Sequence, residues 1–188
     1  GTHFAPHNPN YLDLTSKSNY DPELSMKLMK EARYDGSLEI SLKLPPPSYA
    51  RRGGEIVASQ LRKVGFNVKI SNLEWAQWLE QVFKGKDYNL TIVSHTEPAD
   101  INIYARSDYY FQYDSPKFQK LMSKLNLSSE PSKRRTILHQ AQTLISTEYV
   151  NGFLFQLAKT GVANSKVLGL WTNSPTQAND LTSVKWSE

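Results

Sequence analysis

The chain has 188 residues, of which 39% are hydrophobic and 21% charged, and its formal net charge is +4. A chain of this length can bury about 70% of its unfolded surface, so the composition indicates one globular domain and not a disordered or repetitive protein. There is no cysteine and no apolar stretch near the ~18 residues of a membrane-spanning helix, which excludes disulfides, thiolate metal sites, cysteine nucleophiles and a spanning segment.

The first forty-four residues predict a connection, a helix and a strand. Residues 1–20 mix Pro, Asn, His and Ser without a helical or strand period, so we expect an extended connection there. Asp21-Pro22-Glu23 predicts a helix start, because Asp can accept backbone N–H groups and Pro is tolerated in the first turn. Apolar residues then alternate from Leu38 to Leu44, which predicts a half-buried strand that ends at three prolines.

Helices and strands alternate in the middle of the chain. The expected elements are a helix from about Tyr49 with Gly65 as its C-cap, a strand over 66–70, a helix over 75–83 and a strand over 90–93. This alternation predicts an α/β lobe with a parallel or mixed sheet flanked by helices. Two more helices are expected to open at Ser115-Pro116 and Glu130-Pro131, and a further strand is expected over 153–157.

Motifs for nucleotide or metal chemistry are missing from the sequence. No glycine-rich phosphate loop and no Gly-x-Ser-x-Gly nucleophile turn is present. His3 and His7 are four residues apart, but Pro6 disfavours the helix that would align them as metal ligands. We therefore expect no cofactor and no metal site.

The loop after the strand at 90–93 is the candidate binding site. In open α/β sheets, ligands bind at the carboxyl ends of the strands, and this loop is rich in groups that could satisfy an amine or a hydroxyl. The other interpretation is a hydrophilic turn followed by core aromatics. The candidate ligand-binding residues, including one from the loop after the first strand, are Tyr49, His95, Thr96, Glu97, Asp100, Tyr109 and Tyr110.

Two other functional classes stay open on these residues. A hydrolase or transferase could use His95, Glu97 and Asp100 as an acid–base group, in which case Glu97→Ala would abolish turnover. A nucleic-acid-binding domain would show association that weakens steeply with salt. The basic residues are interspersed with acids except at Arg51-Arg52 and at residues 133–135, so no nucleic-acid partner is expected.

The order of the sequence elements is similar to that of a known family. The elements that carry the similarity are Tyr20-Asp21-Pro22-Glu23, Ala50-Arg51-Arg52, residues 56–61, Lys63-Val64-Gly65, Val68-Lys69-Ile70, Glu74-Trp75 and Asp87-Tyr88-Asn89-Leu90. In this order they resemble the family 5 extracellular solute-binding proteins, the dipeptide, oligopeptide and nickel binders of ABC importers. The similarity runs along the whole chain.

The resemblance implies that the α/β lobe is periplasmic binding protein-like and is the C-terminal one of two lobes that close over a ligand. Family members are usually more than twice this length, so an N-terminal lobe is expected to be missing. Residues 1–20 would then be the connection from that lobe, residues 21–165 the C-terminal lobe, and residues 166–188 a tail that returns toward the missing lobe.

The resemblance also implies binding without catalysis. The expected function is capture of a peptide or similar small solute and its delivery to ABC transporter permease subunits in the membrane, by a periplasmic or lipid-anchored extracellular protein. Peptide binders of the family often carry Gly-Trp after the Asp-Tyr-x-Leu strand, followed by an aspartate that holds the amino terminus of the peptide. Ser94-His95 stands at that position here, and Glu97 and Asp100 are the acids available for the role of the aspartate.

Overall fold

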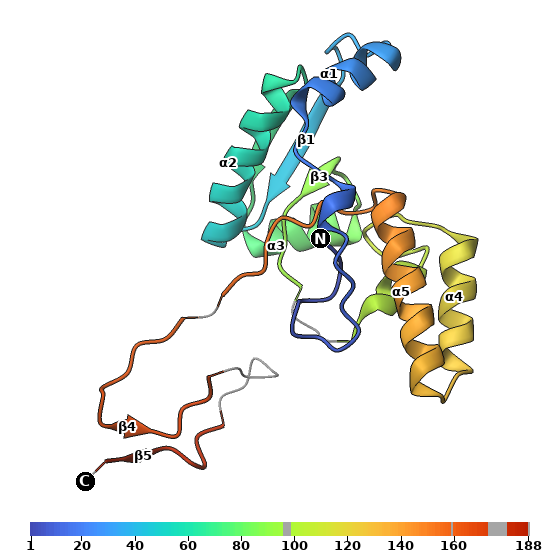
Figure 1. Cartoon of the computed structure of the whole chain (residues 1–188). Coiled ribbons are helices and arrows are strands. Elements are labelled where there is room, and N and C mark those ends of the chain that lie inside the picture. Colours follow the sequence, from blue (N-terminus) through green and yellow to red (C-terminus); the bar gives the residue numbers. More distant parts are fainter. Residues whose placement is uncertain (96–98, 159, 173–179, 188) are drawn as a thin grey trace.

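The computed structural model describes residues 1–95, 99–158, 160–172 and 180–187 of the chain (Figure 1). Its central feature is a three-stranded sheet in the order β2-β1-β3. The strands are β1 (Glu39–Leu44), β2 (Asn67–Asn72) and β3 (Leu90–Thr91), and β1 pairs in parallel with both neighbours. The predicted parallel sheet is confirmed, although β3 is shorter than the strand expected over 90–93.

Helix α2 (Ser48–Lys63) connects β1 to β2 and packs on the sheet. Leu42, Leu44 and Val68 form a small buried core with Ala58 of this helix. A Cβ atom on Gly54 would lie 2.3 Å from Cδ1 of Leu44, so any larger residue would force the buried Leu44 side chain to move.

The ends of the first two helices follow the sequence signals. Helix α1 (Pro22–Glu31) begins after Asp21, whose side chain accepts a hydrogen bond from the backbone N–H of Leu24 at 2.8 Å. Gly65, just after α2, has a φ of +105°, which the predicted C-cap glycine adopts without steric cost. Helix α1 has no buried residue, so it lies on the surface of the body (Figure 1).

The helix expected over 75–83 is present in two parts. It begins as the short helix α3 (Trp75–Trp78) and continues as a π-helix, η2 (Leu79–Lys84). Trp78 of α3 and Val82 of η2 lie in a buried cluster with Tyr110. Hydrophobic periodicity predicted the helical segment but not the π-helical geometry of its second half.

Helices α4 (Pro116–Asn126) and α5 (Pro131–Thr147) pack against each other, to one side of the sheet (Figure 1). Together with the 3-10 helix η3 (Ile101–Ala105) they enclose the largest buried cluster, which contains Phe118 and Ile145. Among the described residues, no helix is both long enough and apolar enough to cross a membrane.

The amino-terminal segment packs against α5. Thr2 and Phe4 are buried, and a second 3-10 helix, η1 (Thr15–Lys17), follows. The fully buried amide of Gln142 anchors this segment, since its oxygen accepts from the Thr2 hydroxyl at 3.2 Å and its nitrogen donates to the carbonyl of Asn10 at 2.8 Å.

After α5 the chain leaves the body and runs to the antiparallel pair β4 (Val167–Leu168) and β5 (Lys185–Trp186) (Figure 1). The strand predicted over 153–157 is wrong, because residues 151–158 contain no strand. Alternating apolar residues form a strand only where another strand supplies backbone partners, and no strand in the described part of the chain pairs with this segment.

Candidate functional site

Two loops that follow parallel strands meet at the carboxyl edge of the sheet. Tyr49 lies in the first turn of α2, after β1, and Ser94 lies after β3. The backbone N–H of Ser94 donates a hydrogen bond to the Tyr49 hydroxyl at 3.0 Å. This contact brings the two loops together at the edge where ligands bind in open α/β sheets.

The carboxylate of Asp100 lies between two histidines. Its Oδ1 is 2.8 Å from Nε2 of His3, and its Oδ2 is 3.5 Å from Nδ1 of His95. Burial by itself raises the pKa of Asp100, but the hydrogen bonds and charges of the two imidazoles outweigh it and hold this pKa well below its usual range. Asp100 is therefore ionised at neutral pH although its side chain is only 14% exposed.

His95 joins this carboxylate to a buried tyrosine. Its Nε2 is 2.9 Å from the hydroxyl oxygen of Tyr110, and the two rings are stacked with an interplanar angle of 9°. An Nδ1–H directed at Asp100 leaves Nε2 as the acceptor for the Tyr110 hydroxyl. Burial raises the pKa of Tyr110, so its hydroxyl stays protonated and can donate to the imidazole.

On the other side of Asp100, His3 leads to a second buried tyrosine. Nδ1 of His3 is 3.3 Å from the hydroxyl of Tyr104, which also accepts a hydrogen bond from Nδ2 of Asn151 at 2.5 Å. Burial raises the pKa of Tyr104 as well, so this hydroxyl is neutral. We call the set Asn151, Tyr104, His3, Asp100, His95 and Tyr110 the Asp100 network.

The aromatic residues of the site also serve the core. Tyr110 is buried against Trp78 and Phe83, at ring-centroid distances of 5.6 and 5.3 Å. Tyr109 is half-buried, lies 4.9 Å from the Tyr110 ring, and has the Arg106 guanidinium 5.6 Å above its own ring. Tyr110 therefore fits both the binding-site and the core interpretation of these aromatics, because its ring packs in the core and its hydroxyl faces His95.

The structure brings together four of the seven predicted site residues, Tyr49, His95, Asp100 and Tyr110, with Tyr109 adjoining them. Thr96 and Glu97 lie outside the described residues. Sequence reasoning missed His3 and Asn151. The sequence suggested His3 only as a metal-ligand partner for His7, and no local spacing connects it to an aspartate 97 residues away.

Within the described ranges, no group of three His, Asp or Glu residues is arranged to hold a metal ion.

The family model for bacterial extracellular solute-binding proteins, family 5 Middle, matches residues 1–118. The chain belongs to this family, whose members are extracellular or periplasmic solute-binding proteins.

Known relatives match the chain over part of their own length. The dipeptide-binding protein of Escherichia coli (strain K12) is 25% identical over 150 residues, which are 72% of this chain and 28% of that protein. The dipeptide binding protein from Pseudoalteromonas sp. SM9913, solved in complex with Met-Leu, superposes with a TM-score of 0.74 at 21% identity, covering 97% of this chain and 39% of that one.

A third relative is the oligopeptide-binding protein AppA from Bacillus subtilis, solved in complex with a nonapeptide. It superposes with a TM-score of 0.65 at 21% identity, over 78% of this chain and 34% of that one. The chain thus spans well under half the length of these relatives. Their likeness confirms the predicted periplasmic binding protein-like fold, and nothing in these comparisons supports the hydrolase or transferase alternative.

Proposed function

We propose that this chain is the ligand-binding C-terminal lobe of the substrate-binding component of an ABC importer. In this proposal, the protein captures a peptide or a similar small solute between two lobes outside the cytoplasm and delivers it to the permease subunits. Membership of the solute-binding family supports the proposal, as do relatives solved with Met-Leu and with a nonapeptide.

The observation that carries the proposal is the ionised carboxylate of Asp100 near the ligand-binding edge of the sheet. A peptide presents an ammonium group at its amino terminus, and a largely desolvated carboxylate is a strong partner for it. Each carboxylate oxygen can accept about two hydrogen bonds, so the contacts to His3 and His95 leave room for a ligand donor.

Tyr49 and His95 complete the proposed contact surface. The Tyr49 hydroxyl bonds to the backbone of Ser94 and the His95 ring bonds to the Tyr110 hydroxyl, so both side chains are held in place before a ligand arrives. Closure of a second lobe would then select the state with the most ligand contacts, and no bond in the solute needs to break.

The test uses the intact two-lobed protein and three forms of it: unchanged, Asp100→Asn, and Asp87→Asn as a control. Asp87 is an exposed carboxylate that pairs with Lys43 at 2.8 Å, so it reports the general loss of one charge. Met-Leu at about 100 times its dissociation constant should stabilise the unchanged protein and the control by about 2.7 kcal/mol in thermal unfolding.

Asp100→Asn should abolish this stabilisation, and N-acetyl-Met-Leu, which lacks the ammonium group, should give none. Equal stabilisation by the acetylated peptide, or an unaffected Asp100→Asn protein, would contradict the assigned contact. Mass spectrometry of the recovered Met-Leu checks the binding-only mechanism, because a cleaved dipeptide would show that the protein is an enzyme.

A further inference from the structure

The positive charge of the chain is concentrated in α4 and α5. Residues 116–147 contain six of the 22 Lys and Arg residues but one of the 18 Asp and Glu residues, Glu130, which lies between the helices. This segment therefore has a net charge of +5, and the remaining 156 residues together have a net charge of −1. Neither helix itself contains a carboxylate.

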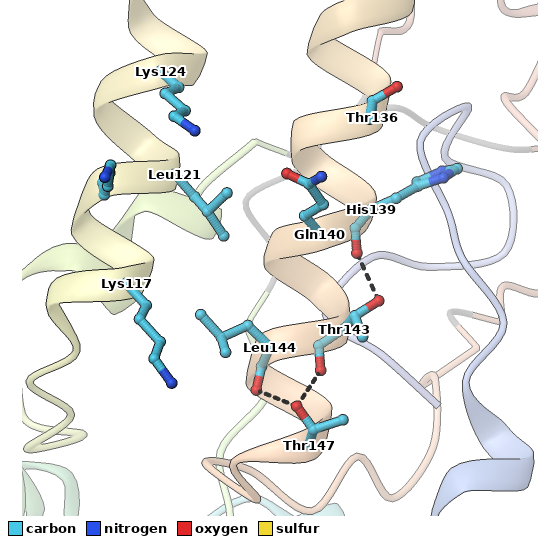
Figure 2. Close-up of a pocket in the computed structure, with 10 residues that line it drawn as sticks. Lys117, Leu121, Lys124, Thr136, His139, Gln140, Thr143, Leu144 and Thr147 are labelled. Carbon is cyan, nitrogen blue, oxygen red and sulfur yellow. Dashed lines mark hydrogen bonds between the residues drawn. The ribbon is translucent and has the colours of Figure 1, made fainter.

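A groove of about 660 Å³ runs between these two helices. Its floor is apolar, because Leu121 of α4 and Leu144 of α5 point toward the space between the helices (Figure 2). Three exposed lysines, Lys117, Lys120 and Lys124, line its α4 side. Their spacing of three and four residues places them on one face of the helix.

The α5 side of the groove offers few hydrogen-bond donors. The hydroxyls of Thr136, Thr143 and Thr147 donate to carbonyls of their own helix, at 3.1, 2.9 and 2.9 Å. Their hydroxyl hydrogens are therefore already used within the helix. The imidazole of His139 points away from α4, so the lysines are the cationic groups of this surface (Figure 2).

These lysines have no counter-charge in the part of the chain that the structure describes, where no ion pair includes Lys117, Lys120 or Lys124. Other basic side chains do have partners. Lys43 pairs with Asp87, and Arg134 donates to the carbonyls of Leu125 and Ser128 at 2.7 and 2.8 Å.

We propose that the α4–α5 groove is a docking site for an acidic amphipathic helix of a partner protein. The apolar stripe of such a helix would cover Leu121 and Leu144, and its flanking carboxylates would meet the row of lysines. Helix α4 has 11 residues, or about 16 Å, which matches three turns of a docked helix. The groove shares no residue with the Asp100 network, so this inference does not depend on the proposed peptide site.

A fluorescein-labelled synthetic peptide of about 18 residues, ~27 Å long as a helix, tests the proposal. It carries a leucine stripe flanked by glutamates, and a matched peptide has glutamine at every glutamate. Fluorescence anisotropy with the 188-residue chain should show binding of the acidic peptide that weakens between about 50 and about 300 mM NaCl, and no binding of its matched partner.

Variants of the chain distinguish the effect of charge at the groove from the effect of the net charge of the chain. The triple charge reversal Lys117→Glu, Lys120→Glu, Lys124→Glu should weaken binding at least tenfold, about 1.4 kcal/mol. A control triple reversal, Lys17→Glu, Lys30→Glu, Lys63→Glu, changes the net charge equally at exposed sites elsewhere and should stay within about twofold. Gln140→Trp, at an exposed position on the groove wall, should block the apolar floor and also weaken binding.

Absence of binding to the acidic peptide, or equal losses in both triple variants, would overturn the proposal. Vesicles of phosphatidylcholine and phosphatidylglycerol and a duplex DNA are tested in parallel. Binding to either of these, lost with the groove lysines while the peptide does not bind, would replace the helix with a membrane surface or a nucleic acid.

Discussion

The body of the molecule, up to Val150, and the segment after α5 contain similar hydrophobic patterns but bury them very differently. In the body, Leu42 and Leu44 of β1 are completely or almost completely buried. In the later segment, Phe155 is 60% exposed and Trp186 66% exposed, and no residue in the ranges 151–158, 160–172 and 180–187 is buried.

The two regions differ in the helices and strands that pack against them and not in the alternation of apolar residues. Strand β1 has β2 on one side and β3 on the other, with α2 packed on its face. Residues 153–157 alternate in the same manner but pair with no strand among the described residues, and only Phe153 at their start packs against the core. Alternation with a period of two residues thus predicts which side chains can lie on one face of a strand. Whether that face is buried depends on a second helix or strand that packs on it.

Truncating one phenylalanine in each region should show this difference most strongly. Phe118→Ala removes a completely buried ring from the largest core cluster and should lower the free energy of unfolding by about 3–5 kcal/mol. Phe155→Ala, in the exposed segment, should change it by less than about 0.5 kcal/mol. Urea unfolding followed by circular dichroism measures both. A large loss in Phe155→Ala would show that this side chain packs on the body in solution.

The body also depends on the partly buried carboxylate of Asp100, and the substitution Asp100→Asn tests this dependence. Replacing the carboxylate removes charge-assisted hydrogen bonds to His3 and His95 and should cost about 1.5–3 kcal/mol at pH 7. Because the folded pKa of Asp100 is lowered, its contribution is complete above the unfolded pKa of about 4 and is lost as the pH falls through the folded pKa.

The unchanged chain should therefore lose more stability than Asp100→Asn on acidification below about pH 4. The hydroxyls of Tyr104 and Tyr110, which face the two histidines, have raised pKa values and do not titrate in this range. Urea unfolding at a series of pH values makes the comparison. Parallel curves for the two proteins would show that Asp100 is not paired in solution.

Two adjacent glycines in α2 give the smallest and most local test. Gly54→Ala places a methyl group 2.3 Å from Leu44 Cδ1 and should cost about 1–3 kcal/mol through overpacking. Gly53→Ala meets no atom within 4 Å and should stabilise the same helix by up to about 1 kcal/mol. Thermal unfolding of both variants gives the sign of each effect. Equal effects would show that α2 does not approach β1 this closely.

Much of the body could be predicted because its signals are local. Asp21 and Ser115 cap their helices as expected, and the alternation of helices and strands indicated the parallel sheet. The π-helix at Leu79–Lys84 was not predicted, since its apolar spacing is also that of an α-helix. The contacts of the Arg51 guanidinium, which donates to the Leu73 carbonyl and pairs with Glu74, also have no local signal in the sequence.

The candidate site also contains residues that a local sequence signal indicates and residues that it does not. The strand-end rule located His95, Asp100 and Tyr49, because the position of a residue after a strand is visible in the sequence. It could not locate His3 or Asn151, which reach the site only through the packing of distant segments. Contacts that span a hundred residues are set by tertiary structure, and a single sequence carries no periodic signal for them.

The hydroxyl of Tyr104 gives the body a mechanical property. It bonds to His3 on the amino-terminal segment and to Asn151 at the start of the segment that leaves α5, so two chain paths are tied to one oxygen atom. A movement that carries both paths together leaves these bonds intact, whereas a movement of one path alone shears them. The two segments are therefore coupled through this hydroxyl. The imidazole of His3 connects the hydroxyl to Asp100, so a displacement of either segment is transmitted to that carboxylate.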